Sequence, residues 1–113
     1  MKAVSVRQPW ANWIAAGHKT VEVRSWATRH RGDLLIVSAR RPALEPAGFA
    51  LAIVTLVDCR PMTEADAVPA CCDAFPGAWA WVLGNLRTLR PFPVRGRLGL
   101  YDVVLPPDRS GER

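Results

Sequence analysis

The sequence predicts an α+β fold that is mainly β: a small β-barrel of about six strands with two or three short helices. Its 113 residues fit a single domain, since two halves of this size would each lie near the lower limit of independent stability. Six or seven short apolar or alternating segments are separated by glycine, proline and polar residues. No long helical segments alternate with them, and closing the sheet into a barrel removes its exposed edges.

The first strand and the first helix are both short. Residues 3–7 alternate between apolar and polar side chains, which predicts a strand. Pro9 suits the first position of a helix because proline has no N–H group to leave unpaired. Gly17 is a good residue to end this helix. Its apolar stripe consists of Trp10, Trp13 and Ile14.

The remaining strands follow from alternation and apolar runs. Gly84-Asn85 is a turn signal, and Gly32 and Asp33 also favour a turn. Trp79 and Trp81 fall on one face of their strand and are core candidates. Strands are predicted at residues 20–26, 34–39, 49–58, 78–83, 87–93 and 100–105.

The other segments are less regular. Thr63 is followed by acidic residues, which predicts a short capped helix over residues 63–68. Residues 40–48 form a connection with room for one helical turn. The domain ends at residue 105, and residues 106–113 are expected to form a flexible tail.

The net charge of +5 is distributed unevenly. Residues 1–41 hold eight basic and two acidic residues, residues 42–86 hold one and five, and residues 87–113 hold six and three. If the two basic ends meet in space, they form one face that attracts phosphate groups. The alternative is an ordinary solvated surface.

The cysteines and the apolar runs indicate the cellular setting. Cys59, Cys71 and Cys72 show no Cys-x-x-Cys spacing, so neither a zinc site nor a disulfide framework is expected. Cys59 is expected to pack as a small apolar side chain. No apolar run reaches the roughly 18 residues of a membrane helix, and the N-terminus lacks an apolar signal core. We expect a cytoplasmic monomer or weak dimer without cofactor or metal.

The segment 17–32 is the densest polar stretch of the chain. In its predicted strand, Val21 and Val23 face one side, and Glu22, Arg24 and Trp26 face the other. An acid and a base are costly to bury unless they find partners. The second face is therefore expected to line a cleft.

Three motifs follow one another in the first third of the chain: Ser5-x-x-Gln8-Pro9-Trp10-Ala11, Gly17-x-Lys19-x-x-Glu22-x-Arg24-x-Trp26 and Thr28-x-His30-Arg31-Gly32. In this order they resemble the ASCH domain (activating signal cointegrator homology), especially the branch found in a eukaryotic transcription coactivator. The resemblance covers roughly residues 3–105 and implies a PUA-like β-barrel. It also implies a cleft, between the first helix and the Lys/Glu/Arg strand, that binds nucleic acid.

The resemblance and the residue types together give a set of candidate contacts. The expected ligand is RNA rather than DNA, with an unpaired or modified base in the cleft, or else a nucleotide-like small molecule. The primary candidates are Gln8, Trp10, Lys19, Glu22, Arg24, Trp26, Thr28, His30 and Arg31. Secondary basic contacts are Arg87, Arg95 and Arg97.

Each candidate also has an ordinary structural interpretation. Trp10 and Trp26 either stack on a base or belong to the core. The amide of Gln8 either reads a base edge or caps the backbone. Glu22 and Arg24 either recognise a ligand or form a structural ion pair.

An enzymatic function is the alternative. Some small bacterial relatives of the family are amidohydrolases that act on N-acylated cytidine nucleosides with a lysine, a threonine and a glutamate. Lys19 matches the lysine, but Glu22 stands where the threonine would be, and Glu64 is the least poor match for the glutamate. If the protein is an enzyme, Lys19 and Glu22 are the catalytic candidates, and ribonuclease activity is a weaker option. A protein-interaction domain in transcription or translation regulation is the third hypothesis.

Overall fold

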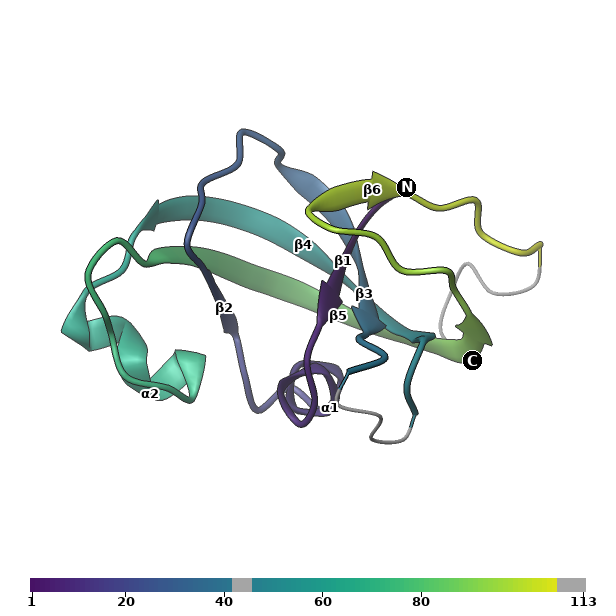
Figure 1. The fold of residues 1–113 in the computed structure, drawn as a ribbon, viewed down its shortest axis with the longest axis horizontal. Coiled ribbons are helices and arrows are strands. Elements are labelled where there is room, and N and C mark those ends of the chain that lie inside the picture. Colours follow the sequence, from purple (N-terminus) through teal and green to yellow (C-terminus); the bar gives the residue numbers. More distant parts are fainter. Residues whose placement is uncertain (42–45, 108–113) are drawn as a thin grey trace.

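The computed structural model describes residues 1–41 and 46–107, and Figure 1 shows their fold. Six strands form one sheet, and the helical elements within the described residues are all short. The strands are β1 (Lys2–Val6), β2 (Val21–Arg24), β3 (Gly32–Ser38), β4 (Phe49–Pro61), β5 (Trp79–Pro93) and β6 (Leu100–Asp102). The helices are α1 (Trp10–Ala15), a 3₁₀ turn (Glu64–Asp66) and α2 (Ala67–Ala70).

The strand order is β2-β5-β4-β3-β1-β6. β1 runs parallel to β3, and the other pairs are antiparallel. β4 and β5 are the longest strands, and shifts in their pairing register bend them. The sheet curls into a half-barrel, so that β1 and β2 both lie in front of β4 and β5 in Figure 1 although they do not pair with each other. The predicted mainly β, barrel-like fold is confirmed.

The core occupies both faces of the sheet. In β3, Leu34 and Ile36 pack in one cluster, and Leu35 and Val37 pack in another. This explains why β3 is apolar on both sides, as expected for a central strand. The first cluster includes the buried face of α1 and the fully buried Trp81. Trp79 packs against the same cluster, and the predicted core position of both tryptophans is confirmed.

The turn predicted at Gly84-Asn85 is wrong. β5 continues through these residues, and Gly84 pairs with Thr55 of β4. Asn85 has a positive φ of 49°, and the register of the pair shifts beside it. Asparagine tolerates positive φ in a bulge as it does in a turn, so Asn85 forms a bend within one strand instead of a turn between two strands.

Several strand boundaries also differ from the prediction, and β4 continues to Pro61 instead of ending at residue 58. Gly32 and Asp33 begin β3 instead of forming a turn. β2 ends at Arg24, so Trp26 lies in the following loop rather than on the strand. β6 ends at Asp102 rather than at residue 105.

Helix α1 begins and ends near the predicted residues. The peptide bond between Gln8 and Pro9 is cis, and Pro9 is the residue before the helix rather than its first residue. Gly17 follows the helix with φ of 83°, which confirms its role in ending it. Trp13 is 38% exposed and is therefore outside the core that the apolar stripe predicted.

The second helical segment has the predicted cap. The side chain of Asp66 accepts a hydrogen bond from the backbone N–H of Thr63, and a 3₁₀ turn then leads into α2. The helical turn predicted within residues 40–48 and the tail at 106–113 fall partly on residues 42–45 and 108–113, outside the described residues. Within the described part of the chain, no helix has the length and apolar character needed to cross a membrane.

Candidate functional site

A cavity of about 320 Å³ lies between β1 and β2, on the side that the curled sheet leaves unpaired. This volume is at the lower end of the range typical of small-molecule sites. Most of its lining comes from β1, β2, the start of α1 and the segment after α2. The lining residues are Ser5, Val6, Arg7, Trp10, Lys19, Glu22, Val23, Arg24, Cys72 and Phe75.

The polar wall of the cavity is a trio of ionic side chains. The side chains of Lys19, Glu22 and Arg24 are 3%, 9% and 22% exposed. Lys19 Nζ lies 3.7 Å from one carboxylate oxygen of Glu22, and Arg24 Nε donates to the other at 2.9 Å. A buried carboxylate is tolerated when it is paired in this way, so the predicted ion-pair interpretation of Glu22 and Arg24 holds structurally.

Backbone carbonyls fix both cations of the trio. Lys19 Nζ donates to the carbonyl oxygen of Ala70 at the end of α2. Arg24 Nη2 donates to the carbonyl oxygen of Ser5 in β1 at 2.6 Å. The trio therefore connects β2 and the residues just before it with α2 on one side and with β1 on the other. Lys19 also lines a smaller cavity of about 200 Å³ on its other side.

The other walls are mainly apolar. Trp10 is partly buried against the core and also lines the cavity. Phe75 is 48% exposed and Cys72 is half-buried, and both lie on the segment that follows α2. An aromatic and aliphatic wall beside a charged one suits a planar, partly polar ring.

Gln8 and Trp26 do not line the cavity. Gln8 is buried, and its amide accepts from the backbone N–H of Asn12 at 2.9 Å and donates to the Asn12 side chain at 3.1 Å. It therefore caps α1. Trp26 packs edge-to-face on Trp81, with the ring centroids 4.9 Å apart, and belongs to the core. For both residues the structural interpretation describes the observed contacts.

The loop between β2 and β3 also lies apart from the cavity lining. The backbone N–H of His30 donates to the Thr28 hydroxyl, and the His30 ring is bonded to the Asp33 carbonyl oxygen. Arg31 donates to the carbonyl oxygens of Thr28 and His30 and lies 3.7 Å from Asp58. These contacts stabilise the loop itself.

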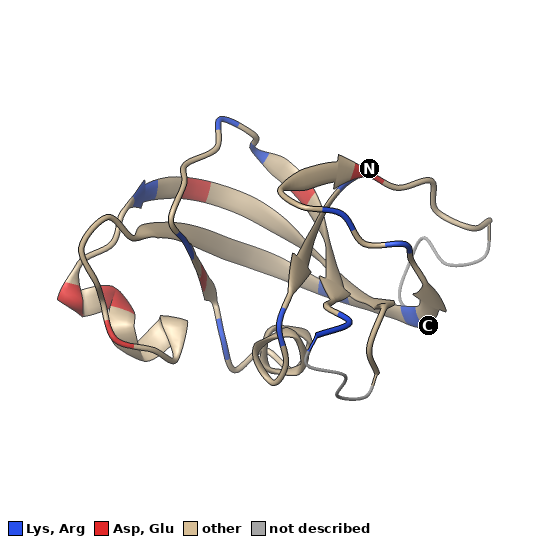
Figure 2. Ribbon diagram, viewed as in Figure 1, with Lys and Arg blue, Asp and Glu red and all other residues tan. Residues whose placement is uncertain are grey.

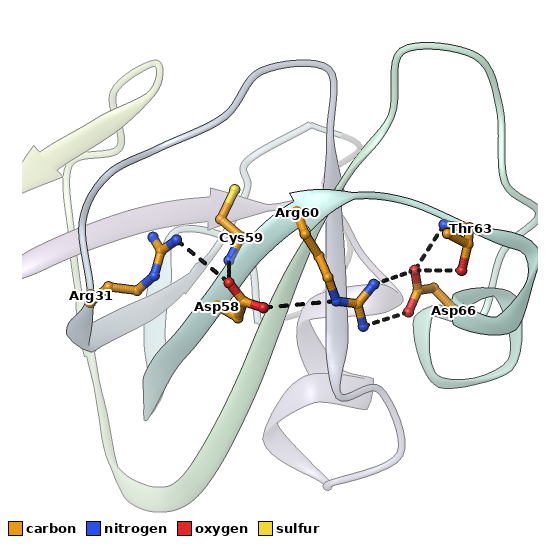
Figure 3. Close-up of polar contacts among 6 residues, drawn as sticks. All are labelled: Arg31, Asp58, Cys59, Arg60, Thr63 and Asp66. Atoms are coloured by element: carbon orange, nitrogen blue, oxygen red, sulfur yellow. Dashed lines mark hydrogen bonds and ion pairs between the residues drawn. The ribbon is translucent and has the colours of Figure 1, made fainter.

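Arg31 is the first member of a chain of ion pairs shown in Figure 3. Asp58 also pairs with Arg60, whose guanidinium forms two hydrogen bonds with the carboxylate of Asp66 at 2.8 and 2.9 Å. These bonds, together with the backbone N–H of Thr63, lower the pKa of Asp66 to about 2. The network fixes the start of the segment that carries α2.

The secondary arginines divide into two groups. Arg87 pairs with Asp33 at 2.9 Å and with nearby groups of β4 and β5. Arg95 and Arg97 are exposed on the loop between β5 and β6. The three arginines therefore do not form one continuous path of basic side chains.

Several residues of the cavity could not be identified from the sequence. The carbonyl groups of Ser5 and Ala70 carry no residue-type signal, because every residue has one. Phe75 and Cys72 lie in a segment without a recognisable pattern. Arg7 is the exception. It ends the predicted first strand and directly precedes Gln8 of the first motif, so its position could have indicated a place in the cavity. In the described residues, no three His, Cys, Asp or Glu side chains gather where they could hold a metal ion.

Comparisons with known proteins identify the family and agree with the fold. Activating signal cointegrator 1 of Homo sapiens is 35% identical, and that of Mus musculus 34%; each alignment covers 50% of this chain and only 14% of the relative. The crystal structure of ASCH from Zymomonas mobilis superposes with a TM-score of 0.72 at 16% identity, covering 91% of this chain and 87% of that chain. The crystal structure of a mutant of that protein superposes with a TM-score of 0.68 at 16% identity, covering 91% of this chain and 89% of that chain. At this identity the likeness shows the fold alone. The sequence profile of the ASCH domain matches residues 4–93, and the chain therefore belongs to the ASCH domain family.

Proposed function

We propose that this domain binds nucleic acid and takes an unpaired or modified base, of RNA rather than DNA, into the cavity between β1 and β2. The observation that carries the proposal is the paired carboxylate of Glu22 in the wall of an open cavity. Each carboxylate oxygen has more than one acceptor site, so Glu22 can also accept from the amino edge of a base. Trp10 and Phe75 supply the faces on which a base can stack.

The size of the cavity favours a single base over a duplex. Proteins that read RNA sequence mostly bind unpaired bases that have been splayed out of a stack. A cavity of about 320 Å³ accommodates one ring system and leaves the sugar and phosphate outside. The net charge of +5 then supports binding of the phosphate backbone.

Fluorescence anisotropy tests the proposal. Labelled single- and double-stranded RNA and DNA of one sequence are titrated with the protein at low salt and again at increasing salt. We expect the tightest binding with single-stranded RNA and a steep loss of affinity as salt rises. If none of the four oligonucleotides binds at low salt, the proposal is wrong.

Glu22→Gln is the most direct variant, because it retains the shape of the side chain and replaces one acceptor oxygen with a donor amide. We expect about tenfold weaker binding of the preferred base and a changed preference among the four bases. Glu64→Gln, which changes an exposed carboxylate outside the cavity lining, is the control with the same charge change. Thermal unfolding of both variants checks that the fold persists. An unchanged base preference in Glu22→Gln contradicts the assigned role.

A second candidate is hydrolysis of an N-acylated cytidine, favoured by the 3.7 Å separation of Lys19 Nζ and Glu22 inside one cavity. In that reaction Lys19 would activate water and Glu22 would move protons. The ammonium of Lys19 already donates to the Ala70 carbonyl, which suits a fixed cation better than a base. Incubation with N-acylated cytidines, followed by chromatography, separates the two candidates: unchanged substrate with folded protein rejects hydrolysis.

A further inference from the structure

The loop between β5 and β6, residues 94–99, passes in front of β1 before it enters the last strand (Figure 1). It carries two exposed arginines, Arg95 and Arg97, and Figure 2 shows blue positions along it. Figure 2 also shows acidic positions gathered around α2, at the other end of the molecule from this loop. Residues of β1 line one side of the cavity and the segment after α2 lines the other, so the surroundings of the two sides differ in charge.

The loop is fixed against a residue that lines the cavity. A Cβ atom added to Gly96 would lie 3.0 Å from the hydroxyl oxygen of Ser5, which is tighter than most Cβ contacts, so the loop packs closely on Ser5 at this glycine. The Ser5 hydroxyl is 2.6 Å from the hydroxyl of Tyr101, which also receives a hydrogen bond from the backbone N–H of Arg97. Ser5 in turn gives its carbonyl oxygen to Arg24. Ser5 therefore contacts both the loop and the ionic trio.

The arginines of the loop have no acidic partner among the described residues. Arg24, Arg31, Arg60 and Arg87 each lie within 4.0 Å of a carboxylate, and no described carboxylate lies that close to Arg95 or Arg97. A guanidinium without a carboxylate is available to a phosphate, for which its paired N–H groups are well suited.

We propose that the loop 94–99 is a phosphate clamp: Arg95 and Arg97 bind the backbone of the RNA strand whose base occupies the cavity. The strand then leaves the cavity over β1 and β6, away from the acidic residues around α2. This inference rests on the proposed function and adds to it the direction of the strand and the residues that hold its phosphates.

The salt dependence of binding tests the clamp. In a single strand, each phosphate contact contributes about 0.7 to the slope of log affinity against log salt. We expect Arg95→Gln and Arg97→Gln each to lower the slope by about 0.7 and to weaken binding at low salt. Arg87→Gln removes the same charge from a paired arginine outside the loop, and it should change the slope much less.

A second variant changes the position of the loop without changing its charge. Gly96→Ala requires a shift of a few tenths of an ångström between the loop and Ser5, so it should weaken oligonucleotide binding modestly while the net charge stays constant. Binding of the free nucleoside, which has no phosphate, should be the same in Gly96→Ala, Arg97→Gln and the unmodified protein. A nucleoside affinity that falls together with the oligonucleotide affinity assigns the effect to the cavity and contradicts the clamp.

The outcomes separate the two proposals. If the unmodified protein binds no oligonucleotide at low salt, both the proposed function and the clamp are wrong. If it binds, and the slopes of Arg95→Gln and Arg97→Gln equal that of Arg87→Gln, the clamp alone is wrong.

Discussion

At the scale of single residues, two lysine–carboxylate pairs in this protein differ mainly in burial. Lys19 and Glu22 are almost completely buried, whereas the side chains of Lys2 and Asp102 are 43% and 77% exposed. Removing one partner of a buried pair leaves an uncompensated charge in a medium that solvates it poorly. An exposed pair loses little, because water replaces the partner.

Lys19→Met is therefore expected to destabilise the protein by about 3 kcal/mol. It leaves Glu22 with a single cation and the Ala70 carbonyl without its donor. Lys2→Met, which removes the same charge from the exposed pair, should cost less than about 1 kcal/mol. Urea unfolding at neutral pH measures both free energies. Equal losses in the two variants would show that the Lys19 pair is not effectively buried.

At the scale of elements, the 3₁₀ turn and α2 depend on one carboxylate. Asp66 accepts hydrogen bonds from Arg60 and from the backbone of Thr63, and these keep its pKa near 2. The pKa is lower than in the unfolded chain, where an aspartate titrates near 3.9. The stabilisation is therefore complete above about pH 4 and is lost as the pH falls towards 2.

Asp66→Asn tests this pH dependence. At neutral pH the variant should be less stable than the unmodified protein, because asparagine cannot pair with Arg60. As the pH falls from about 4 to 2, the difference in unfolding free energy should narrow, since Asp66 itself becomes neutral. Urea midpoints at pH 7, 4, 3 and 2 give the comparison. A difference that stays constant over this range would contradict the assignment.

The elements also show where sequence patterns are sufficient. β3 was predictable because an apolar run without alternation is typical of a strand buried on both faces, as Leu34 to Val37 are. The continuity of β5 was not predictable, because Asn85 can adopt the same positive φ in a turn and in a bulge. Which of the two forms depends on the pairing partner Thr55, and that partner is distant in sequence.

At the scale of the whole molecule, the curl of the sheet creates the site. β1 and β2 are separated by three strands in the sheet order, and curvature brings them to opposite sides of one cavity. Arg24 spans this opening by donating to Glu22 on its own strand and to Ser5 on the other. Its planar guanidinium reaches two acceptors at once.

Arg24→Lys retains the charge but has no planar fork, so it should keep the ion pair with Glu22 and lose the bond to Ser5. We expect the free energy of unfolding to fall by about 1.5 kcal/mol. Amide hydrogen exchange should become faster in β1 and β2, and it should change less in β4. Arg87→Lys is the control on the other side of the sheet. Unchanged exchange in β1 and β2 would mean that Arg24 does not hold the two strands together.

The site was predictable only where its residues share a segment. Lys19, Glu22 and Arg24 lie within six positions of one another, and strand alternation places Glu22 and Arg24 on one face. Their partners, the carbonyls of Ser5 and Ala70, come from distant segments that only the curled sheet and α2 bring near. Trp26 shows the converse: alternation placed it on the same face, but the strand ends at Arg24 and the ring turns into the core.

The cysteine in the cavity wall provides a way to observe the site. Cys72 lines the cavity, whereas Cys59 and Cys71 do not, and all three are free thiols. On a background in which Cys59 and Cys71 are replaced by serine, an environment-sensitive dye can be attached to Cys72 alone. The emission of the dye then reports in solution whether the cavity is occupied, without a label on the bound molecule. On the undyed protein, a bound molecule that fills the cavity shields the Cys72 thiol from alkylation.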